Sequence, residues 1–166
     1  MCVRFCISVI FYCLVVGCGL AGAAALNMDK PHYANQRYGF SLALPPGRWE
    51  AAESANGDGA VLRSDDWKAV VRVYGTRGYA VQGLKFDAAL KQEAGMFAQI
   101  GHREVDRKGG RFSLWGRDHE GQDAFLQCFW GKDAAYIAVV TMPSGLRVPD
   151  FEQVTAWVRR SFKPGF

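Results

Sequence analysis

Beyond its first 26 residues, this chain of 166 residues contains a single cysteine, Cys128. One cysteine cannot form a disulfide within the chain, so a hydrophobic core must stabilise the fold. Catalytic motifs are also missing, because no serine lies in the G-x-S-x-G sequence of a nucleophile elbow. The sequence therefore predicts no catalytic residue, no cofactor and no metal site, and it predicts that the protein is not an enzyme.

Dense charge of either sign is lacking as well. The formal net charge is only +4, and the basic residues are scattered along the chain. The densest basic segment, RRSFK at 159–163, falls at the predicted C-terminus of a helix, where cations are favoured by the helix dipole. This pattern predicts no nucleic-acid partner, and it predicts membrane contact only through the N-terminal segment.

The N-terminal segment is the most distinctive feature of the sequence. Residues 5–26 form an apolar run without a charged side chain. Ala23 and Ala25 form an A-x-A site, which predicts a signal peptide cleaved after Ala25. Cys18 follows Val-Val-Gly, which resembles a lipobox and predicts lipidation of Cys18. A run of this length can also remain as an uncleaved anchor. All three readings predict export, to the periplasm or to the extracytoplasmic surface of a membrane.

The same segment contains Gly17, Gly19 and Gly22, which spell the dinucleotide-binding sequence G-x-G-x-x-G. That motif requires a preceding strand, a following helix and an acidic residue about 20 positions later. Pro31 would end the helix within about two turns, and no second strand with an acidic end follows. The glycines are therefore interpreted as part of the leader.

Apolar patterning divides the rest into a polar linker at 26–36 and one domain at 37–166. Alternating apolar residues predict strands at 40–44, 60–63, 68–75, 111–119, 124–130 and 135–142, and a short segment near Trp49. The short, polar segment at 103–107 is predicted to be an edge strand. Three- and four-residue spacing predicts amphipathic helices at 86–100 and 149–162, with a loop at 76–83. The strand at 135–142 is apolar on both faces and should be central.

Strands joined by short turns pair antiparallel, and the two helices must bury their apolar sides against them. The predicted class is α+β, with an antiparallel sheet of about six to eight strands and two packed helices.

The sequence YGFSLALPPGRW at 38–49, the hairpin at 57–75 and the closing helix together resemble the PsbP-like fold family, which includes the DcrB-like exported bacterial proteins. The resemblance covers 37–163, and it matches positions of the scaffold. It implies a PsbP-like fold and a role in binding or assembly. It transfers no functional residue, because a fold does not specify a function.

Candidate interaction residues are aromatic. Trp67, Trp115 and Tyr79, the last within the loop at 76–83, are predicted to form a contact surface, because exposed aromatics are enriched at binding sites. The alternative interpretation places the tryptophans in the core or at its rim. The polar run at 117–123 is interpreted as a solvated hairpin, since consecutive strand residues point to opposite faces.

Three functions stay open at this point. The leading hypothesis is a non-enzymatic binding or assembly module that contacts another envelope protein. The second is a protein that binds a small ligand or a lipid in a pocket between sheet and helix. The third, a cryptic hydrolase, has the least support.

Overall fold

The computed structural model describes residues 31–145 and 148–165. Cys18 and Ala25 lie outside the described residues, so lipidation and cleavage stay predictions. Within the described part of the chain, no helix is long and apolar enough to span a membrane.

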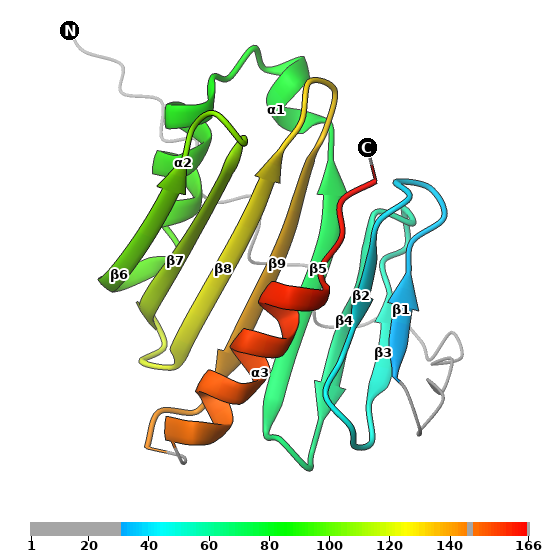
Figure 1. Ribbon diagram of the computed structural model, residues 1–166, viewed down its shortest axis with the longest axis vertical. Helices are drawn as coiled ribbons and strands as arrows, with labels where there is room; N and C mark the ends of the chain where they lie inside the picture. The colour runs from blue at the N-terminus through cyan, green and yellow to red at the C-terminus, as the bar shows by residue number, and fades with distance from the viewer. Residues whose placement is uncertain (1–30, 146–147, 166) are drawn as a thin grey trace, which may run out of the picture.

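A seven-stranded antiparallel sheet forms the centre of the molecule, in the order β3-β4-β5-β9-β8-β7-β6 (Figure 1). Its strands are β3 Glu50–Glu53, β4 Gly59–Ser64, β5 Ala69–Thr76, β6 Phe97–Asp106, β7 Arg111–Asp118, β8 Asp123–Trp130 and β9 Ala135–Met142. The prediction of a central strand at 135–142 is confirmed, because every residue of β9 is buried.

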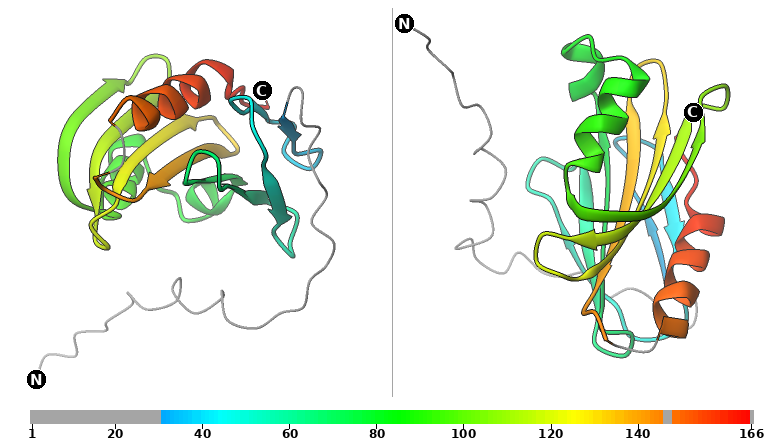
Figure 2. Two further views of the ribbon diagram at one scale, coloured as in Figure 1. Left: turned by 90° about the horizontal axis from the view of Figure 1, so that it is seen from below. Right: turned by 90° about the vertical axis from the view of Figure 1, so that its left-hand side faces the viewer.

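Both faces of the sheet are covered (Figure 2). Helix α3, Val148–Ser161, packs on one face, and the helices α1, Gly78–Val81, and α2, Phe86–Ala94, pack on the other. Alternation along β8 explains the two cores, since Phe125 faces the α3 side and Leu126 faces the α2 side.

A two-stranded hairpin, β1 His32–Ala34 and β2 Ser41–Ala43, shares the α3 side. Residues 32–36 were predicted to belong to a linker, and this is wrong for β1. Tyr33 is buried, and the Asn35 side chain donates a hydrogen bond of 2.9 Å to the carbonyl oxygen of Gly57. A single aromatic in a polar segment gives too little periodicity to reveal a strand.

The helix predicted at 86–100 is too long. Helix α2 ends at Ala94 with Gly95 as its C-cap, and residues 97–106 pair with β7 as strand β6. Phe97 and Ile100 continue the helical spacing in sequence, yet Phe97 is buried in the sheet core and Ile100 is exposed. The hydrogen bonds that residues 97–106 form with β7 therefore determine the local structure, and the helical spacing of apolar residues does not. The strand predicted at 103–107 is the end of β6, and the loop predicted at 76–83 contains the short helix α1.

The predicted fold class is confirmed as α+β. The main sheet has seven strands, within the predicted range, and the helices α2 and α3 have nine residues or more.

Candidate functional site

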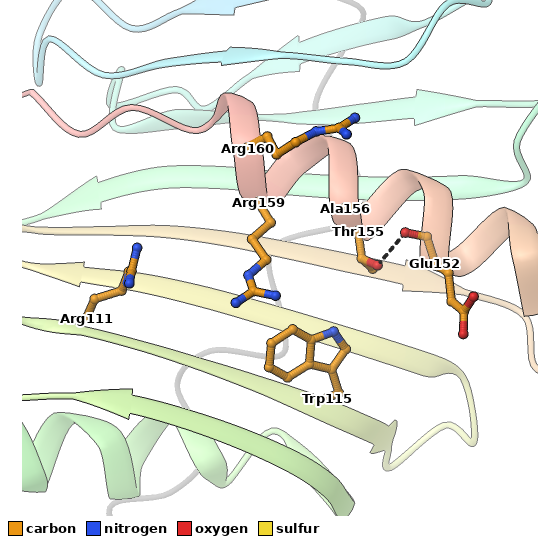
Figure 3. Close-up of a pocket in the computed structure, with 7 residues that line it drawn as sticks. All are labelled: Arg111, Trp115, Glu152, Thr155, Ala156, Arg159 and Arg160. Atoms are coloured by element: carbon orange, nitrogen blue, oxygen red, sulfur yellow. Dashed lines mark hydrogen bonds between the residues drawn. The ribbon is translucent and has the colours of Figure 1, made fainter.

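A groove of about 440 Å³ lies between α3 and β7, on the face of the sheet that α3 covers (Figure 3). We call it the α3 groove. It is lined by Arg111, Trp115, Glu152, Thr155, Ala156, Arg159 and Arg160. Helix α3 contacts β8 and β9, so the face of β7 beside it is only partly covered.

Trp115 forms the wall of the α3 groove on the sheet side. Its indole is half-buried and lies 4.9 Å from the Phe125 ring and 5.1 Å from the His102 ring, measured between centroids. The guanidinium of Arg159 lies 5.3 Å from the centre of the Trp115 ring, a cation–π distance (Figure 3). Phe125 and Arg159 therefore hold the indole in place.

The α3 groove carries an excess of positive charge. Arg159 is paired with Glu104 on β6, and Arg160 lies over the Trp157 ring at 5.7 Å. Arg111 makes no ion pair with a residue of the described chain. Since Glu152 is the one carboxylate among the described lining residues, the groove favours an acidic group.

Polar side chains are buried on the same face of the sheet. Ser113 on β7 pairs in register with Gln127 on β8, between Arg111 and Trp115 along β7. Gln127 is 1 % exposed, and its Oε1 accepts no hydrogen bond within the described part of the chain. A buried acceptor without a donor is costly, so such groups in native proteins call for an explanation.

Trp67, one of the predicted interaction residues, is held far from this groove. It lies in the turn between β4 and β5, and β9 and β8 separate β5 from β7. Its Nε1–H donates a hydrogen bond of 2.9 Å to the carbonyl oxygen of Pro46. Trp67 therefore fixes the Pro-Pro-Gly loop, and its ring is half-buried against the core.

Tyr79 is not available as a contact residue, because it is buried on the α2 side. Its ring stacks on Trp130 at 5.5 Å between centroids, and its hydroxyl donates a hydrogen bond to Glu93. Trp67, Trp115 and Tyr79 thus lie in three separate places, and the structure brings only Trp115 into a groove. The sequence could not place Tyr79, because α1 carries no recognisable helical pattern.

Burial on the α2 side also raises the pKa values of ionisable groups, among them Glu93 and Cys128. Desolvation raises the pKa of Glu93 from 4.5 to about 7. Desolvation also raises the pKa of the Cys128 thiol well above its usual value, with the charge of Glu93 as a second cause. Cys128 is fully buried, so it behaves as a small core residue.

The polar run at 117–123 forms the β7–β8 turn. Asp118 accepts hydrogen bonds from the backbone N–H groups of Glu120 and Gln122, at 2.9 and 2.8 Å. The His119 ring contacts the Gly95 carbonyl oxygen at 3.1 Å. Among the described residues, no three His, Cys, Asp or Glu side chains gather as metal ligands do.

Sequence reasoning missed most of the α3 groove. Arg159 and Arg160 were interpreted as helix C-terminal cations, and Arg111 as the start of a strand. The buried Gln127, which does not line the groove, is visible in the sequence as a single amide between Phe125 and Phe129.

No family model matches the chain, and no curated protein matches it. Among solved structures, the chain is similar to cyanobacterial PsbP (CyanoP) from Synechocystis sp. PCC 6803. The TM-score is 0.54 at 14% sequence identity, and the match covers 90% of this chain and 98% of that chain. A protein from Bacteroides thetaiotaomicron VPI-5482 gives a TM-score of 0.44 at 17% identity, over 75% of this chain and 44% of that one, too low to carry an argument.

The likeness to CyanoP establishes the scaffold. The chain has a PsbP-like fold, which confirms the resemblance seen in the sequence. At this level of identity the similarity shows the fold alone.

Proposed function

We propose that the protein is an exported, non-enzymatic binding or assembly module, and that its α3 groove receives an acidic segment of an envelope protein. The observation that carries the proposal is the groove itself. Arg159 lies over the Trp115 indole there, Arg111 and Arg160 also line the groove, and Glu152 is the one carboxylate among its described lining residues. Arginine and tryptophan are the residue types that dominate binding energy at protein interfaces.

Export is the second part of the proposal. It is supported by the apolar segment at 5–26 with its A-x-A site. A PsbP-like scaffold is compatible with a protein outside the cytoplasm. Cleavage after Ala25 would release the domain, whereas lipidation at Cys18 would hold it at a membrane surface.

The groove also supports the alternative of a small-ligand or lipid site. Its volume of about 440 Å³ falls in the usual range for small-molecule pockets. The Trp115 indole offers an apolar wall, and the arginines that line the groove offer hydrogen-bond donors for a polar or anionic group of such a ligand. Native mass spectrometry of protein from its own cells should then show a bound small molecule, and an apo mass would count against this alternative.

Charge reversal in the α3 groove tests the partner hypothesis. Tagged protein, crosslinked in intact cells of the source organism, should retain an envelope protein that Arg111→Glu and Trp115→Ala lose. Arg63→Glu is the matched control, because Arg63 is exposed on β4 and lies outside the groove. Equal retention by the Arg111 and Arg63 variants would show that the groove is not the binding site.

The non-enzymatic part has its own test. Ester and peptide substrates should show no turnover above that of a His119→Ala control. Turnover that this variant loses would support the hydrolase hypothesis instead.

A further inference from the structure

A second, larger cleft lies at the end of the sheet where β5 and β8 end and β9 begins, the upper end in Figure 1. Its volume is about 720 Å³. It shares no lining residue with the α3 groove. We call it the basic cleft, because five cationic side chains line it: Arg37, Arg77, Arg107, Lys108 and Lys132.

These cations come from four separate parts of the chain. Arg37 precedes β2, and Arg77 follows β5. Arg107 and Lys108 belong to the β6–β7 turn, and Lys132 belongs to the β8–β9 turn. The fold therefore gathers at one end of the sheet a charge that no stretch of sequence displays.

Acidic neighbours neutralise only part of this charge. Arg37 pairs with Asp58 at 3.1 Å, and Arg107 pairs with Asp87 at 3.0 Å. The other three cations, Arg77, Lys108 and Lys132, make no ion pair with a described residue. Asp133 is the one carboxylate among the described residues that line the cleft.

Two of the arginines are held over a single aromatic ring. The guanidinium carbons of Arg37 and Arg77 lie 5.6 and 6.0 Å from the centre of the Tyr38 ring. The Tyr38 ring is fixed because it packs directly against the backbone of Gly75. A side chain at position 75 would collide with it, since a Cβ atom there would lie 2.5 Å from the ring. Like charges gathered in this way repel each other, and a bound anion would relieve that repulsion.

We infer that the basic cleft binds a multiply charged phosphate group, either of a soluble phosphorylated compound or of a lipid headgroup. Guanidinium groups offer paired N–H donors that match phosphate oxygens, and lysine ammonium groups add charge from the opposite turns. The cleft is large enough for more than one phosphate. This inference does not depend on the proposed function of the α3 groove.

Inorganic pyrophosphate is the first probe, measured by titration calorimetry on the full chain. We expect saturable binding that Arg77→Gln combined with Lys132→Gln weakens about tenfold or more, since each charged hydrogen bond contributes substantially. Arg63→Gln with Arg103→Gln is the control, because both arginines are exposed, lie outside the cleft and remove the same charge. Lys108→Gln with Lys132→Gln, both in turns, serves as a second variant should the first not fold.

Vesicles distinguish the two sources of phosphate. Binding to vesicles of phosphatidic acid in phosphatidylcholine that requires Arg77 and Lys132 assigns the site to a lipid headgroup. Pyrophosphate binding without vesicle binding assigns it to a soluble compound. The inference is overturned if neither probe binds saturably, or if the cleft and control variants lose affinity equally.

Discussion

Glu93 is the residue whose charge state matters most to the core on the α2 side. Its raised pKa, about 7 where 4.5 is ordinary, means that the folded state binds a proton more tightly than the unfolded state. Folding is therefore favoured at low pH, and the free energy of unfolding should fall as pH rises from about 4.5 to about 7. At about 1.4 kcal/mol for each unit of pKa, the loss amounts to roughly 3 kcal/mol.

Glu93→Gln should remove this pH dependence. The amide still accepts a hydrogen bond from the Tyr79 hydroxyl but carries no charge. Urea unfolding at pH 5 and pH 8 should show a variant more stable than the wild type at pH 8, with a smaller difference at pH 5. Glu50→Gln, at an exposed position of β3, should match the wild type at both. If Glu93→Gln changed the free energy of unfolding equally at pH 5 and pH 8, the ionisation of Glu93 would not be what destabilises the folded state.

Gln127 carries a second prediction at the scale of one residue. Gln127→Met keeps the shape of the side chain and removes its buried unpartnered oxygen. The free energy of unfolding should rise by about 1 kcal/mol, because an unsatisfied buried acceptor destabilises the folded state. Urea unfolding measures this, with Gln99→Met at an exposed position of β6 as control. A loss of stability of similar size would show that Gln127 is hydrogen-bonded in the folded protein.

At the scale of elements, strands with strong alternation were predictable and weakly patterned ones were not. Strands β7, β8 and β9 match their predicted ranges within one residue, because each alternates or is wholly apolar between turn-forming glycines. Helix α2 was extended wrongly into β6, where Phe97 and Ile100 mimic helical spacing. Strand β1 was missed because only Tyr33 marks it.

Strand β1 supplies a prediction that separates a structural element from a tether. Tyr33→Ala should lower the free energy of unfolding by about 3 kcal/mol, since it removes a buried aromatic ring that contacts Phe40. His32→Ala, its exposed neighbour, should change stability by less than about 0.5 kcal/mol. Thermal or urea unfolding of both variants decides the matter. No effect at Tyr33 would restore the interpretation of this segment as a linker.

For the molecule as a whole, the sequence predicted the fold class and offered a pocket between sheet and helix as an alternative, but it did not reveal the residues that line either cleft. Both clefts depend on residues that only the tertiary fold brings together. Trp115 on β7 meets Arg159 on α3, which lies over 40 positions later in the chain. The cations of the basic cleft come from segments between Arg37 and Lys132. Basic residues that are far apart in the sequence are therefore close together on the surface of the folded protein.

If a partner binds in the α3 groove, site-specific photocrosslinking in living cells should capture it there. A photoreactive residue at Ala156, exposed on α3 and lining the groove, is compared with one at Gln153, exposed on the same helix outside the groove. We predict an envelope protein crosslinked at Ala156, absent at Gln153 and lost when Arg111→Glu is added. The same crosslinks at both positions, or none at Ala156, would show that the α3 groove is not where a partner binds.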